Sequence, residues 1–300
     1  QNQNDETRCF IENHDIVGRK PGEAYKIVKG KDFPEGLAEP RVEDQVDTTL
    51  TAKAIEFIRR NAENPFFLYF SPCAPHTHVT PAAKFRGTSQ CGLLGDYVQE
   101  LDSHVGDVLA TLDELKLTDN TLVIFTSDNG GSYKDFKGTA GTKLNLASEE
   151  GDILNKYQTA KEDAKKMGHS TNGIWRDGKG HPEEGGHRIP FIARWPGHIT
   201  PDTTSDHTLC LTDIMSTAAG ILQTDLPQDA GEDSISLLPK LMEKQASKPV
   251  RRFIFVQGDT NDDAIAICTG RWKMIAGKGS NQVEAIQLYD LTADPAETKN

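Results

Sequence analysis

Three short, mainly apolar runs alternate along the chain with longer segments of helical periodicity, and this alternation constrains the fold more than any other feature. In the longer segments, apolar residues recur every three or four positions, which is typical of amphipathic helices. The run 66–70 predicts a strand that is buried on both faces, 121–126 predicts another buried strand and 189–195 predicts a third strand. Their alternation with helices predicts an α/β protein with a layered sheet. The apolar runs are 66–70, 121–126 and 189–195, and the helical segments are 42–60, 95–115 and 209–222.

The last fifty residues follow a different pattern. Short strands that follow one another closely are typical of antiparallel sheets. We therefore expect a larger domain over residues 1–249 and a small antiparallel subdomain over residues 250–300. Residues 1–42 indicate loops and a hairpin, and the polar stretch 132–172 has room for a helix around 152–166. The short apolar segments near the end are 252–256, 264–268, 273–275 and 286–289.

Acidic residues outnumber basic ones, and this balance argues against some classes of partner. The 300 residues contain 33 Lys and Arg against 45 Asp and Glu, which gives a formal net charge of −12. We expect no nucleic acid and no basic membrane-surface contact, because both depend on excess positive charge. No apolar run reaches the roughly 18 residues of a membrane-spanning helix. Five scattered cysteines without a C-x-x-C pair predict neither a zinc ribbon nor a dense disulfide framework.

Polar side chains that suit a metal ion follow the second apolar run. Asp128 and Asn129 come almost directly after residues 121–126, and in open α/β sheets ligands bind beyond the carboxyl ends of the strands. A carboxylate oxygen and an amide oxygen at adjacent positions suit hard cations such as Ca²⁺ and Mg²⁺. The letters Ser-Asp-Asn-Gly-Gly also make an ordinary turn after a strand, so the motif by itself leaves both interpretations open.

Two histidines and one lysine are further candidates. His76 and His78 lie in a proline-flanked loop after the first apolar run, with no Cys or acidic residue at zinc spacing. Each histidine is either a proton donor or anion contact, or is hydrogen-bonded within its loop. Lys179 lies between two glycines that leave its ammonium group accessible to an anion, although a solvated turn has the same pattern. Arg188 enters the third apolar run, where we expect it to pair with a carboxylate.

Together, and in this order, these motifs resemble the sulfatase family, the formylglycine-dependent branch of the alkaline-phosphatase superfamily. The resemblance runs from about residue 45 to residue 300. Its most specific part is Glu-Gly-Gly-x-Arg-x-Pro-x-x-x-x-Trp-Pro-Gly with Ser-Asp-Asn-Gly upstream. The matching segments are 64–70 with the histidine loop, 101–102, 127–131, 178–180, 184–198, 211–214, 270–275, 288–291 and 294–295.

The resemblance implies an activity and residue roles. Sulfatases hydrolyse sulfate esters with a formylglycine nucleophile and a divalent cation, usually Ca²⁺ and alternatively Mg²⁺. By this resemblance Asp128 and Asn129 are metal ligands, while Lys179 and His78 contact the sulfate. We prefer His78 because an apolar residue and, slightly later, Pro81 follow it. A Pro-His-Thr pattern in other members favours His76, which stays the alternative catalytic histidine.

The resemblance also implies a fold, a substrate class and a location. The fold is a three-layer α/β/α sandwich around a mixed sheet, plus a small C-terminal antiparallel subdomain. The substrate is a sulfated small molecule or carbohydrate, and the long insert 132–172 would border the entrance of the site. The location is periplasmic or extracellular. The sequence does not indicate the oligomeric state.

One part of the family pattern is missing. The nucleophile motif, C/S-x-P/A-x-R, should precede the histidine loop together with two metal-binding aspartates, and these 300 residues contain neither there. Cys73-Ala-Pro continues as His-Thr, and Ser247–Arg251 fits the letters at the wrong end of the chain. We therefore expect roughly the C-terminal two thirds of a sulfatase, with the formylglycine upstream and no turnover by this chain alone. The alternatives are a phosphoesterase or phosphonate hydrolase of the same superfamily, and a non-catalytic relative that binds a sulfated glycan.

Overall fold

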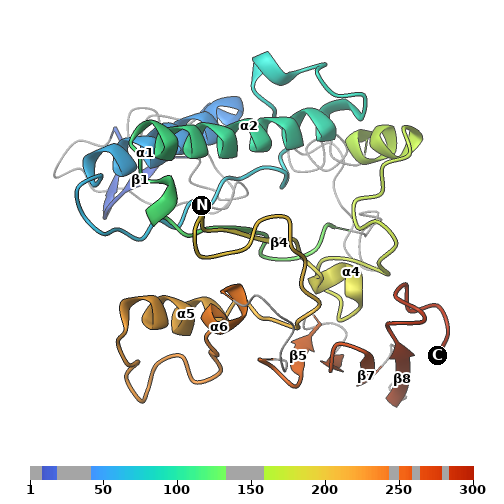
Figure 1. Ribbon diagram of the computed structural model, residues 1–300. Helices are drawn as coiled ribbons and strands as arrows, with labels where there is room; N and C mark the ends of the chain where they lie inside the picture. Colours follow the sequence, from blue (N-terminus) through green and yellow to red (C-terminus); the bar gives the residue numbers. More distant parts are fainter. Residues whose placement is uncertain (1–8, 19–41, 133–158, 243–249, 259–263, 279–283) are drawn as a thin grey trace. The chain divides into compact units, whose positions relative to one another are not determined.

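The chain is divided into two compact units, each made of segments that are distant in sequence. The computed structural model describes residues 9–18, 42–132, 159–242, 250–258, 264–278 and 284–300 (Figure 1). One unit comprises residues 1–117 and 135–169, and the other comprises residues 118–134 and 170–300. Helices and sheets are both present, so the predicted α/β class is confirmed. Most of the stretch 132–172 lies outside the described residues, and residues 159–166 are helical. The domain boundary at residue 250 stays a prediction.

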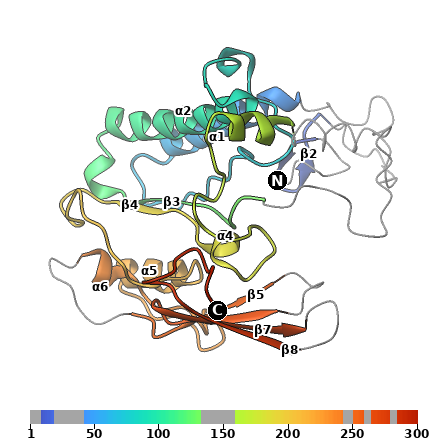
Figure 2. The ribbon, with the colours of Figure 1, turned by 90° about the vertical axis from the view of Figure 1, so that its right-hand side faces the viewer.

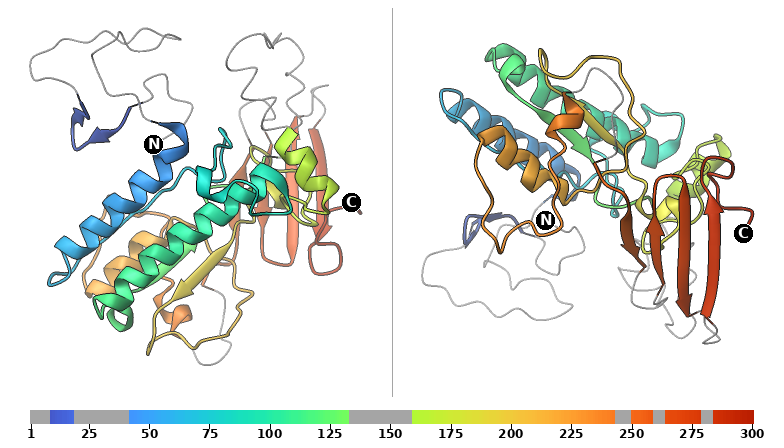
Figure 3. Two further views of the ribbon diagram at one scale, coloured as in Figure 1. Left: turned by 90° about the horizontal axis from the view of Figure 1, so that it is seen from above. Right: turned by 60° about the horizontal axis from the view of Figure 1, so that its bottom comes forward.

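Two long helices form the framework of the first unit. α1 (Val46–Arg60) and α2 (Gly92–Glu114) confirm the helices predicted at 42–60 and 95–115, and they lie side by side (Figure 3). Their carboxyl ends meet where Arg59 Nη2 lies 2.6 Å from Glu114 Oε2. The apolar stripes bury Ala54 and Ile58 on α1, and Leu94, Tyr97 and Leu112 on α2. The first unit also contains the helical residues 159–166, the hairpin β1 (Ile11–Glu12) and β2 (Asp15–Ile16), and the 3-10 helices η1 (Glu43–Gln45) and η2 (Ala83–Phe85).

The strand predicted over residues 66–70 is not formed. The segment has no regular secondary structure, and no described strand pairs with it. Its side chains alternate in their exposure to solvent: Phe67 is 71% and Tyr69 80% exposed, while the other three are half-buried. The prediction of burial on both faces was therefore wrong. An apolar run becomes a doubly buried strand only where neighbouring strands and a covering layer are available.

The second unit begins with the strand that precedes the candidate metal ligands. η3 (Thr118–Asn120) leads into β3 (Val123–Thr126), which pairs antiparallel with β4 (Phe191–Arg194). Both strands were predicted with longer bounds, and β3 is only half-buried along its length. α5 (Asp213–Leu222) confirms the helix predicted at 209–222, and α6 (Leu238–Leu241) is a single turn.

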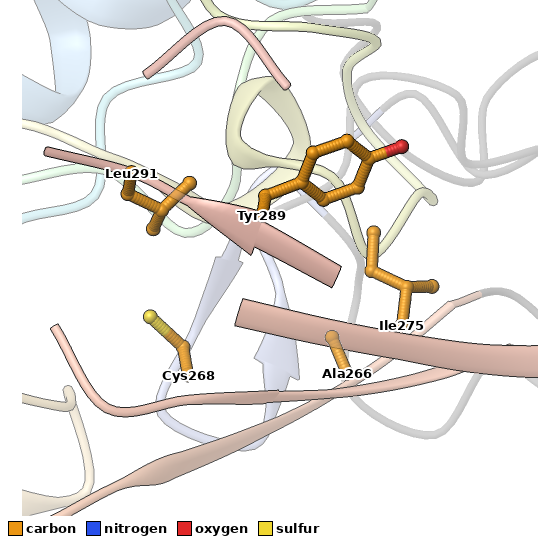
Figure 4. Packing of buried hydrophobic residues seen from close by; sticks show 5 residues of the cluster. All are labelled: Ala266, Cys268, Ile275, Tyr289 and Leu291. Atoms are coloured by element: carbon orange, nitrogen blue, oxygen red, sulfur yellow. The ribbon is translucent and has the colours of Figure 1, made fainter. Parts of the chain in front are cut away.

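A four-stranded antiparallel sheet forms the C-terminal part of the second unit, as predicted. Its strands follow one another in order (Figure 2). One face carries a buried apolar cluster that includes Ile275. Lys273 lies two positions before Ile275, so its side chain points to the same face, and it is 0% exposed. A fully buried ammonium group needs charged partners nearby. The strands are β5 (Ile254–Gln257), β6 (Ile265–Cys268), β7 (Trp272–Lys278) and β8 (Glu284–Asp290). The cluster consists of Ala266, Cys268, Ile275, Tyr289 and Leu291 (Figure 4).

Candidate active site

The loop after β3 presents Asp128 and Asn129 just beyond the end of the strand. The Ser127 hydroxyl donates to the Asn129 carbonyl oxygen (3.0 Å), and Asn129 Nδ2 donates to the Gly130 carbonyl oxygen (2.9 Å). The second bond uses the amide nitrogen of Asn129 and leaves its Oδ1 atom available to accept a contact. Asp128 is exposed, and within the described residues no hydrogen bond or ion pair engages its carboxylate. The loop thus offers a carboxylate and an amide oxygen at adjacent positions.

The glycines that follow Asn129 allow close backbone contact. Gly130 N–H donates to the Gly186 carbonyl oxygen (2.9 Å), and a Cβ atom on Gly130 would lie 1.8 Å from the Gly185 carbonyl oxygen. Neither Gly130 nor Gly185 has a positive φ, so the turn itself does not require glycine at these positions. The sequence pattern suggests a tight turn, whereas the structure shows contact between the β3 loop and α4 (Glu184–His187).

Lys179 belongs to the same group of loops. Its backbone N–H donates to the Gly131 carbonyl oxygen (3.0 Å), and the Asn172 side chain bonds both Gly131 and the Asp177 carbonyl oxygen. Gly180 has a φ of +87°, a conformation that would strain most other residues. The Lys179 side chain is exposed. One main-chain hydrogen bond and the Asn172 side chain therefore join the Lys179 loop to the Asp128 loop, while contact of the Lys179 ammonium group with an anion stays a prediction.

The histidine loop lies in the first unit and is held at both ends by buried carboxylates. Asp47 on α1 accepts the backbone N–H groups of Cys73 (2.6 Å) and Ala74 (2.9 Å). Glu100 on α2 accepts the N–H of Ala82 (2.9 Å). Asp47 and Glu100 are 3% and 1% exposed. Burial raises the pKa of Asp47, and the two N–H bonds oppose that rise because they stabilise the carboxylate.

His76 and His78 lie between these two anchors. His76 is exposed, and its Nδ1 atom lies 2.6 Å from the Thr77 carbonyl oxygen, which places a proton on Nδ1. His78 is half-buried. This geometry does not separate the two candidates, so the preference for His78 stays a prediction. Sequence reasoning missed Asp47 and Glu100: Asp47 is marked only as an acidic residue in the first turn of α1, and Glu100 is not in the first turn of α2.

Lys273 of β7 is the centre of a buried charge cluster beside α4. Its Nζ atom lies 3.0 Å from Glu184 Oε1, 3.0 Å from Glu297 Oε1 and 2.9 Å from His187 Nε2. Arg188 Nη1 donates to the other carboxylate oxygen of Glu184 (2.8 Å), which is the kind of pairing expected for Arg188. Burial by itself would raise the pKa of Glu184, but Lys273 and Arg188 hold it below its ordinary value. Burial and the Lys273 charge lower the pKa of His187 to about 4, so this imidazole is neutral at pH 7.

Arg176 connects the Lys179 loop to the C-terminal sheet. Four hydrogen bonds from one planar guanidinium group fix both its position and its orientation. The acceptors are the Tyr289 hydroxyl (2.7 Å), the Glu297 carbonyl oxygen (2.8 Å), Glu183 Oε1 (2.9 Å) and Gln287 Oε1 (2.9 Å). The candidate loops of the second unit therefore rest on side chains from β7, β8 and the C-terminal tail.

Asp128 and Asn129 fit a divalent cation in their chemistry but do not complete its coordination. Within the described parts of the chain, no group of three or more His, Cys, Asp or Glu side chains is placed to hold a metal ion. Ca²⁺ takes about six to eight oxygen ligands. Water, substrate oxygens or other residues would have to supply most of them.

Comparison with known proteins identifies the relatives of this chain. The family model described as Sulfatase matches residues 5–224, and the model described as N-sulphoglucosamine sulphohydrolase, C-terminal, matches residues 175–300. The N-acetylgalactosamine-6-O-sulfatase of Bacteroides thetaiotaomicron is 33% identical over 307 residues, which cover 96% of this chain and 55% of the relative. Human N-acetylgalactosamine-6-sulfatase is 34% identical, over 69% of this chain and 34% of its own. Human steryl-sulfatase is also 34% identical, over 74% of this chain and 33% of its own.

Comparison with solved structures also finds similar proteins. A structure from work on glycosaminoglycan metabolism by Bacteroides thetaiotaomicron superposes with a TM-score of 0.75 and 30% identity, covering 98% of this chain and 65% of the other. A sulfatase from Pseudoalteromonas sp., at 24% identity and a TM-score of 0.70 over 89% of this chain and 54% of its own, shares the fold. The chain thus spans between a third and about two thirds of the length of these proteins. None of the described helices is both long enough and apolar enough to cross a lipid bilayer.

Proposed function

Because the chain belongs to the sulfatase family, we propose that the protein of which it is part hydrolyses sulfate esters. The observation that carries this proposal is the joining of the Asp128 and Lys179 loops within one unit, in a chain whose residues 5–224 match the family model. A cation and an ammonium group on neighbouring loops would concentrate positive charge where the oxygens of an anionic ester are bound.

Asp128 and Asn129 would hold a divalent cation, for which we favour Ca²⁺ over Mg²⁺. When bound, the cation acts as a Lewis acid on the sulfate oxygens. The formylglycine nucleophile of this proposal would come from sequence outside residues 1–300. The present chain contributes groups that bind and orient the ester, so we expect neither turnover nor tight Ca²⁺ binding from residues 1–300 alone.

Lys179 and one histidine would divide two tasks. As the S–O bond to the alcohol breaks, negative charge grows on the bridging and terminal oxygens, and a fixed ammonium group stabilises that charge more than it stabilises the ground state. The departing alkoxide needs a proton, which an imidazole nitrogen of His78, or of His76 as the alternative, would deliver.

The substrate class that we propose is a sulfated carbohydrate. Two of the three curated relatives named above are N-acetylgalactosamine-6-sulfatases, and one of them aligns with 96% of this chain. Steryl-sulfatase is equally similar over a shorter part of the chain, so a sterol sulfate is the competing substrate. On the family resemblance we also propose a periplasmic or extracellular location.

The test uses the whole protein and measures release of the anion from three esters: a 6-sulfated N-acetylgalactosamine, a steryl sulfate and an aryl phosphate. Lys179→Ala should lower kcat by about 10²-fold to 10³-fold with a smaller change in KM, because it removes an interaction that strengthens in the transition state. Lys53→Ala removes an exposed lysine from α1 and should leave both constants unchanged. Faster hydrolysis of the phosphate ester than of either sulfate, or a wild-type kcat in Lys179→Ala, would contradict the proposal.

A further inference from the structure

Lys273 is fully buried, and the charges around it are balanced. Lys273 and Arg188 provide two positive charges, Glu184 and Glu297 provide two negative charges, and His187 is neutral at pH 7. Replacing a buried ion cluster with apolar residues of similar volume is often neutral or stabilising, so stability does not explain why a lysine is buried here. What such a cluster adds is a fixed geometry, because breaking one charged contact leaves the remaining partners buried and unpaired.

The cluster acts on a very short stretch of backbone. Glu184 is the first residue of α4, and Glu297 Oε2 accepts its backbone N–H (2.8 Å). Lys273 contacts the side chains of both glutamates, so α4 is held by its first N–H and by its first side chain. The next two residues, Gly185-Gly186, are those that touch Gly130. A displacement of α4 would therefore displace the β3 loop.

We propose that Lys273 is a positioning residue for the metal site: from β7 it holds α4, and through Gly186 it sets the position of the loop that carries Asp128 and Asn129. This inference rests on the proposed function, because it concerns the cation that these two residues would bind. Lys273 lies in the C-terminal sheet and contacts Glu184 of α4, so its proposed role is to position the loop and not to touch the substrate. Through Lys273, the C-terminal sheet would support the metal site.

The experiment compares Ca²⁺ binding by the whole protein with and without the lysine. Lys273→Met keeps most of the side-chain volume and removes the charge. We expect its dissociation constant for Ca²⁺, measured by titration calorimetry, to rise about tenfold or more, as is typical when a group that orients a metal ligand is lost. The activity at limiting Ca²⁺ should fall in proportion and recover at saturating Ca²⁺. If Lys273 served stability alone, the folded variant would melt at a lower temperature but bind Ca²⁺ like the wild type.

Two further variants keep the proposal falsifiable. Arg271→Met removes the same charge from an exposed ion pair just before β7 and should leave the dissociation constant unchanged. Should Lys273→Met not fold, Glu297→Gln takes its place, because it weakens the contact with Lys273 and keeps the side-chain size. We expect about a threefold rise in its dissociation constant. A wild-type value in folded Lys273→Met, or in Glu297→Gln where that variant replaces it, overturns the proposal.

Asp128→Ala separates this inference from the proposed function. Loss of Ca²⁺ binding in that variant supports the metal site on which both depend. If Asp128→Ala binds Ca²⁺ normally, the proposed metal site is wrong, and hydrogen exchange in residues 127–131 then decides the positioning role. Faster exchange there in Lys273→Met than in Arg271→Met supports positioning of the loop, and equal exchange overturns it.

Discussion

The two units hold their candidate site segments by different means. In the first unit, carboxylates of Asp47 and Glu100 accept main-chain N–H groups at the two ends of the histidine loop. In the second unit, the Asp128 loop is held by backbone contact between Gly130 and α4, and α4 in turn is held by the charge cluster around Lys273. Within the histidine loop these carboxylates bond only main-chain N–H groups, so they leave the side chains of the loop unrestricted. Backbone contact, by contrast, requires positions without a side chain.

The two arrangements also respond to charge in opposite ways. Burial raises the pKa of Asp47, so the fold holds this carboxylate against a solvation penalty. In the second unit the pKa of Glu184 lies below its ordinary value despite burial, because Lys273 and Arg188 are close to it. We therefore expect the first unit to be sensitive to the loss of single acceptors. The second should be sensitive to any change in volume or charge at α4.

Gly130→Ala should have the largest effect and tests the backbone contact directly. A Cβ atom 1.8 Å from the Gly185 carbonyl oxygen cannot be accommodated without displacing backbone. We expect a loss of about 3 kcal/mol or more in the free energy of unfolding, at the upper end of overpacking effects. Gly106→Ala on α2, where nothing lies within 4 Å of the added atom, should instead stabilise by up to about 1 kcal/mol. Urea unfolding measures both, and equal stabilities would remove the distinction between the units.

The helices and the C-terminal sheet could be predicted from the sequence because their signals are local. Apolar spacing of three and four gave α1 and α2, and four short apolar segments gave β5 to β8. The segment 66–70 could not be predicted in the same way. Its apolar letters predict a buried strand, but whether a strand forms depends on neighbours that the letters of the segment do not specify.

For the candidate site, the sequence indicated the residues on its loops but not what holds those loops. Asp128 and Lys179 were singled out separately, and the structure joins their loops through Gly131. Lys273 was only one letter of a matching segment, and its partner Glu184 stands 89 positions away in the chain. Contacts at such separations carry no periodic signal, and a buried lysine has the same letter as an exposed one.

Asp47→Ala should have the next largest effect, and it should be confined to the first unit. The substitution leaves the N–H groups of Cys73 and Ala74 without their acceptor in a buried place, at a cost of about 2 to 3 kcal/mol. Hydrogen exchange should become faster in residues 73–82 and stay unchanged in residues 184–194. Asp102→Ala, at an exposed position of α2, is the matched control and should leave stability within about 0.5 kcal/mol. If the two substitutions prove equal, water replaces the carboxylate and Asp47 does not hold the loop.

The smallest predicted effect is a difference in acid sensitivity that depends on His187. Burial and the Lys273 charge lower its pKa from 6.5 to about 4. The Arg188 charge lowers the pKa slightly further, and the Glu184 charge opposes this lowering. Between these two values the unfolded chain binds a proton that the folded chain does not, so stability falls as the pH falls from 6.5 towards 4. Between pH 7 and pH 5 this group should cost about 2 kcal/mol.

His187→Gln tests this prediction, because the glutamine oxygen can accept from Lys273 but takes up no proton. Urea unfolding at pH 7 and pH 5 should show a smaller loss of stability in the variant than in the wild type, by about 2 kcal/mol. Asp47 has the opposite sign: its raised pKa means that the folded chain takes up a proton more readily than the unfolded one, so acid does not weaken the first unit through this group. Acid should therefore destabilise residues 184–194 before residues 73–82. An identical pH dependence of the variant and the wild type would show that the charge cluster around Lys273 tolerates a protonated His187, and the electrostatic contrast between the two units would then be lost.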